Sequence, residues 1–171
     1  MIKKTIPTIL LIILIMQYSC KKIEEPIIGE LVINELMPVN STIIADQNGE
    51  FDDWIEIFNL SSSSIDVSGY YISDNKGDIS KWQIPEGTLI TGNGYLIIWA
   101  DKDTTQAGLH SNFKLSSLGE ELVFSKPDGT LIDEIVFPAQ TLELSYSRYP
   151  DGTGPFSWKS PTFNKTNSDS K

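Results

Sequence analysis

The sequence predicts an all-β protein, built as a sandwich or barrel of about eight or nine strands. Short runs rich in β-branched and aromatic residues recur along the chain, and turn residues bound each run. No stretch between residues 27 and 165 has the apolar spacing of a helix. Turns at short, fairly regular intervals disfavour an α/β fold. A chain of 171 residues is long enough for one such domain.

Residues 1–19 are predicted to be a signal peptide. A basic start with Lys3 and Lys4 precedes an almost wholly apolar run at residues 6–16. This run is too short to span a membrane, which needs about 20 apolar residues, and it fits the apolar core of an export signal. Ser19 and then Cys20, the single Cys of the chain, follow the run.

The sequence around Ser19 and Cys20 resembles the lipobox of bacterial lipoproteins. In that family the signal is cut before the Cys, and the Cys sulfur and new amino terminus are acylated, with palmitate among the acyl groups. Each buried methylene contributes about 0.8 kcal/mol to such an anchor. The resemblance implies a membrane partner through lipid on Cys20, and a place in the bacterial cell envelope, at the outer membrane or cell surface. The alternative is an ordinary signal peptide that leaves Cys20 as an incidental thiol.

Residues 20–29 are predicted to be a tether, because they are charged, contain Pro26 and show no periodicity. Glu24 and Glu25 follow the Cys closely. Such an acidic pair resembles the surface-export signals of some bacterial lipoproteins, and a solvated linker is the alternative.

The domain itself is expected at residues 30–167, with a disordered tail at 168–171 and fraying from residue 161 onward. The predicted strands are 31–36, 54–58, two short pieces within 65–72, 82–84, 95–100, 121–124, 130–137 and 144–149. The continuous apolar run at 95–100 predicts a central strand covered on both faces. Asp128-Gly129 between two runs predicts a hairpin.

These runs and the motifs between them resemble the lamin-tail domain family over about residues 30–167. The matching motifs, in order, are Ile33-Asn34-Glu35, Asp53-Trp54-Ile55-Glu56-Ile57-Phe58-Asn59, Val67-Ser68-Gly69-Tyr70, Ser73-Asp74, Ile84-Pro85-Glu86-Gly87-Thr88, Gly94-Tyr95-Leu96, Trp99-Ala100-Asp101, Asn112-Phe113-Lys114-Leu115, Gly119-Glu120, Asp128-Gly129, Asp133, Ser145-Tyr146-Ser147-Arg148 and Pro150-Asp151-Gly152.

The resemblance implies an immunoglobulin-like β-sandwich and carries no established catalytic residues. Similar bacterial proteins are exported, and the domain often sits beside hydrolases as an accessory module. We therefore expect a non-catalytic, envelope-anchored module that binds or tethers a protein or an envelope polymer. The alternatives are a hydrolase with an unrecognised carboxylate site and a nucleic-acid-binding accessory module.

The charge balance disfavours the nucleic-acid alternative. The chain has 13 Lys and Arg against 23 Asp and Glu, a net charge of −10. Nucleic-acid binding needs clustered cations that displace counterions from phosphates. The single Cys and single His also exclude a disulfide framework and a multi-His metal site.

No cofactor is expected, with calcium as the one candidate. The loop at residues 46–53 is rich in acidic and amide oxygens, which are the ligands that Ca²⁺ prefers. The candidate ligands are Asp46, Asn48, Asp52 and Asp53. The alternative is a solvated turn in which Asn48-Gly49 supplies a positive φ.

Other polar residues are expected to be structural. Glu35 and Glu56 lie within strand patterns and need partners if buried, although paired carboxylates can act in glycoside hydrolysis. His110 has Asp101 and Asp103 near it in sequence, but no strained Gly-x-Ser-x-Gly turn exposes a nucleophile. We expect His110 to lie on the surface or to brace its loop.

The four Trp residues could form a sugar-stacking face, but aromatic residues also fill sandwich cores, and core filling is the expectation. Of Trp54, Trp82, Trp99 and Trp158, we expect Trp82 and Trp158 to be the ones exposed to solvent, if any are.

The only Arg of the chain, Arg148, is predicted to clamp one early-strand carboxylate: Glu35, Asp53 or Glu56. Guanidinium binds carboxylate through two parallel hydrogen bonds. The alternative is a surface Arg that awaits an anionic ligand.

Overall fold

The computed structural model describes residues 29–140 and 143–168, which form eleven β-strands and no helix. The prediction of an all-β, immunoglobulin-like sandwich is confirmed, although two strands beyond the predicted set are present. In this part of the chain, no helix is long and apolar enough to cross a lipid bilayer.

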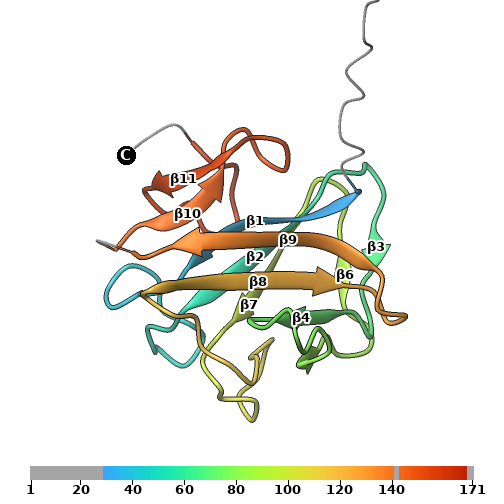
Figure 1. The fold of residues 1–171 in the computed structure, drawn as a ribbon, viewed down its shortest axis with the longest axis horizontal. Coiled ribbons are helices and arrows are strands. Elements are labelled where there is room, and N and C mark those ends of the chain that lie inside the picture. The colour runs from blue at the N-terminus through green and yellow to red at the C-terminus, as the bar shows by residue number, and fades with distance from the viewer. Residues whose placement is uncertain (1–28, 141–142, 169–171) are drawn as a thin grey trace, which may run out of the picture.

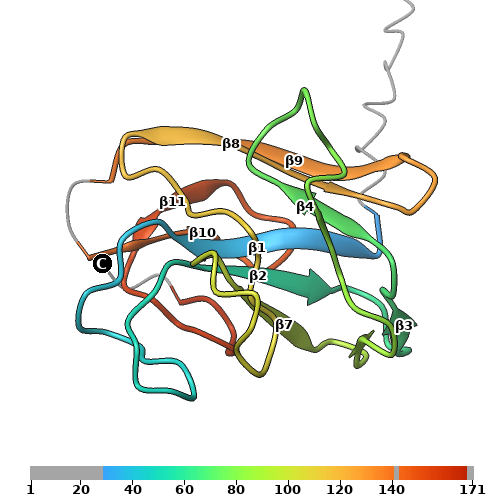
Figure 2. The ribbon, with the colours of Figure 1, turned by 90° about the horizontal axis from the view of Figure 1, so that it is seen from below.

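Two antiparallel sheets form the layers of the sandwich (Figures 1 and 2). The larger sheet has the order β11 (Phe156–Lys159), β10 (Ser145–Arg148), β1 (Leu31–Met37), β2 (Trp54–Asn59) and β7 (Tyr95–Trp99). The smaller sheet has the order β5 (Trp82–Gln83), β4 (Tyr71–Ser73), β8 (Gly119–Ser125) and β9 (Leu131–Pro138). A separate ribbon pairs β3 (Ile65–Asp66) with β6 (Leu89–Ile90).

Alternating side chains of the central strands build the core. Ile55 and Ile57 of β2 are fully buried and belong to one apolar cluster with Leu122 and Phe124 of β8. Each such side chain contributes about 1.5–3 kcal/mol by leaving water. The opposite side chains of β2 are therefore on the outer face of the larger sheet.

A bulge in β1 brings two carboxylates together on that outer face. The register between β1 and β2 shifts between Ile33 and Glu35, and Glu35 then pairs directly with Glu56. A bulge adds one residue to a strand and re-aims the side chains that follow it. Neither carboxylate is exposed to solvent.

The C-terminal segment, residues 160–167, covers this outer face. Phe163 contacts Trp54 edge-on, with ring centroids 5.1 Å apart, and also contacts Trp99 at 5.5 Å. Asn167 is only 3% exposed. The expectation of fraying from residue 161 was therefore wrong, because this segment packs against the sheet up to Asn167.

Strand β7 is an edge strand of its sheet, so the prediction of a central strand was wrong. The apolar residues of β7 are covered by other parts of the chain instead of by a further strand. The Phe163 ring covers Trp99, and the edge continues into the loop that follows, where Trp99 N donates to Leu109 O and Ser111 N donates to Trp99 O. The strands that the sequence analysis missed are β6 and β11.

The chain enters the sandwich at one end and carries its longest loops at the other. Leu31, the first residue of β1, pairs with Asn59, whereas Met37 pairs with Trp54, which in turn pairs with Trp99. The loops at residues 38–53 and 100–118 therefore emerge at the end of the sandwich opposite Leu31, which we call the distal end (Figure 1).

Candidate functional site

The amide side chain of Gln106 joins the two distal loops. Its Nε2 donates to Glu50 Oε2 of the first loop at 2.6 Å and to Asp103 Oδ2 of its own loop at 2.8 Å. Its Oε1 accepts a hydrogen bond from Asn48 Nδ2. One neutral amide thus lies between two carboxylates from separate loops.

Asp46 closes a tight turn in the first loop. Its Oδ1 accepts hydrogen bonds from Asn48 N and Glu50 N, each at 2.8 Å, and its backbone N donates to Glu50 O. Gly49 has φ of 86°, a conformation that glycine adopts without steric cost. The turn predicted at Asn48-Gly49 is therefore present.

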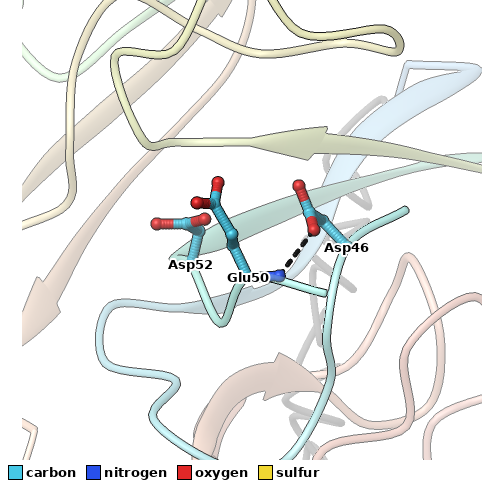
Figure 3. Close-up of side chains that lie close together, drawn as sticks. All are labelled: Asp46, Glu50 and Asp52. Atoms are coloured by element: carbon cyan, nitrogen blue, oxygen red, sulfur yellow. Dashed lines mark hydrogen bonds between the residues drawn. The ribbon is translucent and has the colours of Figure 1, made fainter. Parts of the chain in front are cut away.

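This turn gathers three carboxylates, Asp46, Glu50 and Asp52. One oxygen of each lies within 4.8 Å of the others. Figure 3 shows the oxygen of Asp46 that makes no hydrogen bond on the same side of the loop as the Glu50 carboxylate. Asp46 is 8% exposed, and its Oδ2 is buried with no hydrogen-bond partner.

Two of the predicted calcium ligands lie outside this cluster. Asp53 accepts a hydrogen bond from Leu115 N at 3.1 Å, and burial raises the pKa of Asp53 from 3.8 to about 7. The side chain of Asn48 is bound to Gln106. Of the predicted set Asp46, Asn48, Asp52 and Asp53, the structure therefore brings together only Asp46 and Asp52. Asp53 points elsewhere because it directly precedes β2, and alternate residues of an extended segment point to opposite sides.

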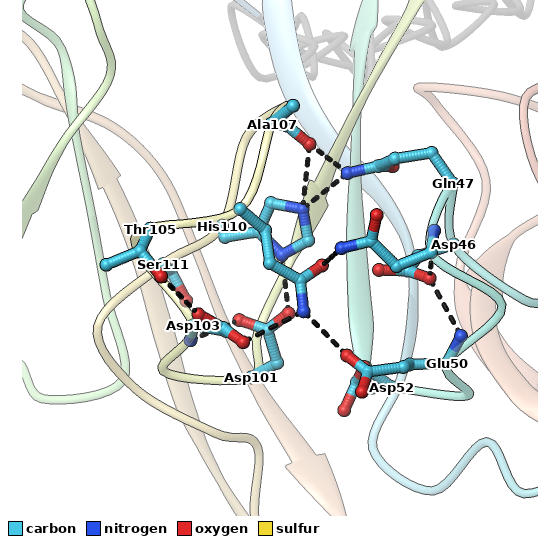
Figure 4. Close-up of polar contacts among 12 residues, drawn as sticks. Asp46, Gln47, Glu50, Asp52, Asp101, Asp103, Thr105, Ala107, His110 and Ser111 are labelled. Atoms are coloured by element: carbon cyan, nitrogen blue, oxygen red, sulfur yellow. Dashed lines mark hydrogen bonds and ion pairs between the residues drawn. The ribbon is translucent and has the colours of Figure 1, made fainter.

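His110 and Asp101 form a buried pair beside the acidic turn (Figure 4). His110 Nδ1 lies 2.5 Å from Asp101 Oδ2, and His110 is 3% exposed. His110 Nε2 lies 2.8 Å from Gln47 Nε2 and 3.2 Å from Ala107 O. His110 therefore braces the two distal loops, and the surface position considered for it is wrong.

These residues do not assemble a nucleophile. The hydroxyl of Ser111, which neighbours His110 in sequence, is buried and donates to Phe113 O at 3.1 Å. Gln47 and Ala107, not a hydroxyl, face His110 Nε2. A catalytic Ser must lie within hydrogen-bond reach of its base.

Glu35 and Glu56 are occupied by the C-terminal segment. Glu35 accepts from Thr162 N at 3.0 Å and from Thr162 Oγ1 at 2.6 Å. Glu56 accepts from Asn34 Nδ2 at 2.9 Å and from Asn164 N at 2.7 Å. The structural pairing expected for these two carboxylates is present.

Burial dominates the protonation of this pair. It raises the pKa of Glu35, and it raises the pKa of Glu56 from 4.5 to about 8, with the Glu35 carboxylate adding to the effect. The hydrogen bonds from Asn34 and Asn164 oppose the shift without cancelling it. Glu56 is thus held largely in its neutral form at pH 7.

Arg148 does clamp a carboxylate, but its partner is Asp133 and not Glu35, Asp53 or Glu56. Its Nη2 lies 3.0 Å from Asp133 Oδ2, and its Nε donates to Ile33 O at 2.9 Å. Asp133 Oδ2 also accepts from Ile33 N at 2.9 Å. The partner differs because Arg148 lies on the same face of β10 as Tyr146, which packs against the main core, whereas Glu35 and Glu56 lie on the outer face of the sheet.

Three of the four Trp side chains are buried, as core filling predicts. Trp82 is 9% exposed and lies in the main core, so the expectation that it is exposed was wrong. Trp158 is half-buried and packs on Tyr146, with ring centroids 4.9 Å apart.

A pocket of about 310 Å³ opens near the N-terminal end of the domain, where Leu31, Tyr70 and Leu131 contribute apolar surface. Its charged lining residues are Glu30 and Lys126. It is therefore separate from the distal cluster.

Sequence reasoning missed the roles of Gln47 and Gln106, because neither belongs to a motif and both act across loops distant in sequence. Cys20, the predicted lipidation site, lies outside the described residues, as do residues 1–28 in general.

A family model described as Lamin Tail Domain matches residues 25–139 of the chain. No curated protein matches the sequence. Strands β10 and β11 and the segment that covers the outer face lie beyond the matched range.

Proposed function

The chain belongs to the lamin tail domain family, and from that membership we propose that it is a non-catalytic binding or tethering module anchored through its N-terminus in a bacterial cell envelope. The observation that carries the proposal is that the start of the domain and its longest loops lie at opposite ends of the sandwich. The chain enters at one end, and its longest loops emerge at the other. An N-terminal anchor would hold the distal loops away from the membrane, where a protein or an envelope polymer can reach them.

The state of the ionisable groups supports a non-catalytic role. Glu35 and Glu56 are covered, and their oxygens accept hydrogen bonds from the C-terminal segment and from Asn34. His110 is closed off by Asp101 and Gln47. A catalytic acid or base must lie within hydrogen-bond reach of the proton that it transfers. These groups instead make hydrogen bonds inside the protein.

The anchor is tested by Cys20→Ala in the full chain. We expect the unchanged protein to sediment with membranes and Cys20→Ala to appear in the soluble fraction, because several acyl chains bind a bilayer far more tightly than one. Mass spectrometry of the mature N-terminus supplies the second measurement. A variant that still sediments with membranes at the same mass would contradict the anchor.

The binding end is tested by photo-crosslinking in cells. Leu118 is 82% exposed at the distal end, and Leu89 is 59% exposed near the N-terminal end. We expect a photoreactive residue at position 118 to crosslink to an envelope component and the matched residue at position 89 to give much less product. Equal crosslinking at both positions would argue against recognition at the distal end.

A further inference from the structure

We propose that Asp46, Glu50 and Asp52 bind a calcium ion at the distal end of the sandwich. The three residues lie in one short turn, and one oxygen of each lies within 4.8 Å of the others (Figure 3). Two oxygens that share one Ca²⁺ can lie about 5 Å apart, since each sits about 2.3–2.6 Å from the ion. The three oxygens are therefore close enough to share one ion with at most a small adjustment of the side chains.

The buried Oδ2 of Asp46 points independently to a cation. Asp46 is more than nine-tenths buried, and its Oδ2 accepts no hydrogen bond. A buried carboxylate oxygen without a partner loses its hydration with no compensation, and native proteins rarely leave one unsatisfied. The other oxygen of the same side chain is fully used by the turn, so Oδ2 is held in place and directed to the cluster.

Glu50 and Asp52 also keep free ligand capacity. Glu50 gives Oε2 to Gln106 and makes no hydrogen bond through Oε1 among the described residues. Asp52 Oδ1 lies 3.8 Å from the Lys114 ammonium, and within the same part of the chain the Asp52 carboxylate accepts no hydrogen bond. All three carboxylates can therefore contribute an oxygen without breaking a contact that holds the loop.

The surrounding charge favours a divalent ion. The carboxylates of Asp101, Glu50 and Asp46 lie close enough to Asp52 to repel its negative charge. Lys114 is the cation that opposes this effect, and its side chain is 56% exposed. A bound cation would relieve the repulsion among these groups.

The ligand set fits calcium better than magnesium. Ca²⁺ accepts six to eight oxygen ligands in a flexible geometry, so water molecules can fill the coordination positions that the three carboxylates leave vacant. Mg²⁺ demands a near-ideal octahedron at about 2.0–2.1 Å. A site with only three protein ligands predicts a Kd of about 10⁻⁴–10⁻³ M, the range of extracellular calcium modules.

The test uses the purified full chain, stripped with a chelator and titrated with CaCl₂ in a calorimeter and in thermal melts. We expect saturable heat and a rise in Tm, because an ion that binds only the folded state stabilises it. Glu50→Gln and Asp52→Asn each remove one charge outside the hydrogen bonds of the Asp46 turn, so both variants should fold. Each should weaken the calcium Kd about tenfold or more.

Asp66→Asn is the matched control. Asp66 is an exposed carboxylate in a separate turn, where its Oδ1 accepts from Ser68 N at 2.9 Å. This variant should retain the calcium Kd of the unchanged chain. Absence of heat and of any Tm shift up to about 10 mM CaCl₂, roughly ten times the weakest expected Kd, would overturn the proposal. An equal shift with MgCl₂, or unchanged affinity in both cluster variants, would also overturn it. The measurement needs neither membrane nor partner, so its failure would leave the tethering function intact.

Discussion

At the scale of single residues, the ion pair between Arg148 of β10 and Asp133 of β9 links the two sheets of the sandwich. The guanidinium binds Asp133 and Ile33 O and also lies over the Phe156 ring, with its carbon 4.4 Å from the centroid. The side chains of Arg148 and Asp133 are only 18% and 15% exposed. Removing one member of such a pair leaves the other charge poorly solvated.

We therefore expect Arg148→Ala to lower the free energy of unfolding by about 3 kcal/mol. Arg148→Lys should lose less stability than Arg148→Ala but should not match the unchanged chain, because an ammonium cannot make the two parallel hydrogen bonds of a planar guanidinium. Urea denaturation provides the measurement, and Lys76→Ala is the control. The pair of Lys76 with Glu134 is largely exposed, so its loss should cost less than about 1 kcal/mol. Equal losses in Arg148→Ala and Lys76→Ala would refute the clamp.

Glu56 makes the stability of the fold depend on pH. Its pKa is about 8 in the folded protein against an ordinary 4.5. Below pH 4.5 the Glu56 carboxyl is protonated in both the folded and the unfolded chain, so its burial places no charge in the protein and does not lower stability. As the pH rises from 4.5 to 8, the unfolded chain releases this proton before the folded chain does, and stability is lost at about 1.4 kcal/mol per pH unit.

The expected result is a urea midpoint that falls steadily between pH 5 and pH 8 and a flatter dependence in Glu56→Gln. The comparison rests on the slope, because the amide substitution also changes the contact with Asn164 and shifts stability at every pH. Glu134→Gln, at an exposed position of β9, should keep the full slope. A slope unchanged in Glu56→Gln would show that another group titrates.

At the scale of elements, the C-terminal segment closes the outer face through Phe163. This residue has φ of 37°, in the left-handed region that favours glycine, while its ring packs on Trp54 and Trp99. At this position the ring contacts therefore stabilise the folded segment, whereas the backbone conformation destabilises it.

Phe163→Ala and Phe163→Gly separate the two effects. Both variants lose the ring contacts, and we expect both to be less stable than the unchanged chain. Phe163→Gly should nevertheless be more stable than Phe163→Ala by roughly 1 kcal/mol, because Gly adopts this φ without strain. The reverse order would mean that the segment is loosely held. Trp fluorescence during urea denaturation reports the change directly, since Trp54 lies beneath the ring.

The elements also show what the sequence could reveal. Period-two alternation identified β2, and β-rich runs between turn residues located most of the other strands, because local steric preferences and burial act within a few residues. The position of β7 at an edge, the partner of Arg148 and the bridge through Gln106 depend on segments brought together from distant parts of the chain. The loop predicted to bind calcium does gather carboxylates, and two of the four predicted ligands, Asp46 and Asp52, are among them. Only the folded turn sends Glu50 into the cluster and Asp53 away from it.

At the scale of the whole molecule, the excess of acidic side chains predicts weak contact with nucleic acid. With a net charge of −10 and a single Arg, the chain has few cations to replace the counterions of a phosphate backbone. We expect no change in the fluorescence anisotropy of a labelled DNA duplex on adding the full chain at physiological salt. Saturable binding that weakens as salt rises would revive the nucleic-acid alternative.

The position of β1 between β2 and β10 has a consequence for synthesis. Ile33 and Arg148 are 115 residues apart in sequence but in contact in the folded sheet. A ribosome that adds about 5–20 residues per second takes on the order of ten seconds to make that interval. During this time the nascent chain presents β1 with one unpaired edge, the kind of surface that recruits chaperones or associates with other chains. In the folded sheet β10 covers this edge, so the edge stays open until that strand has been made and has paired with β1.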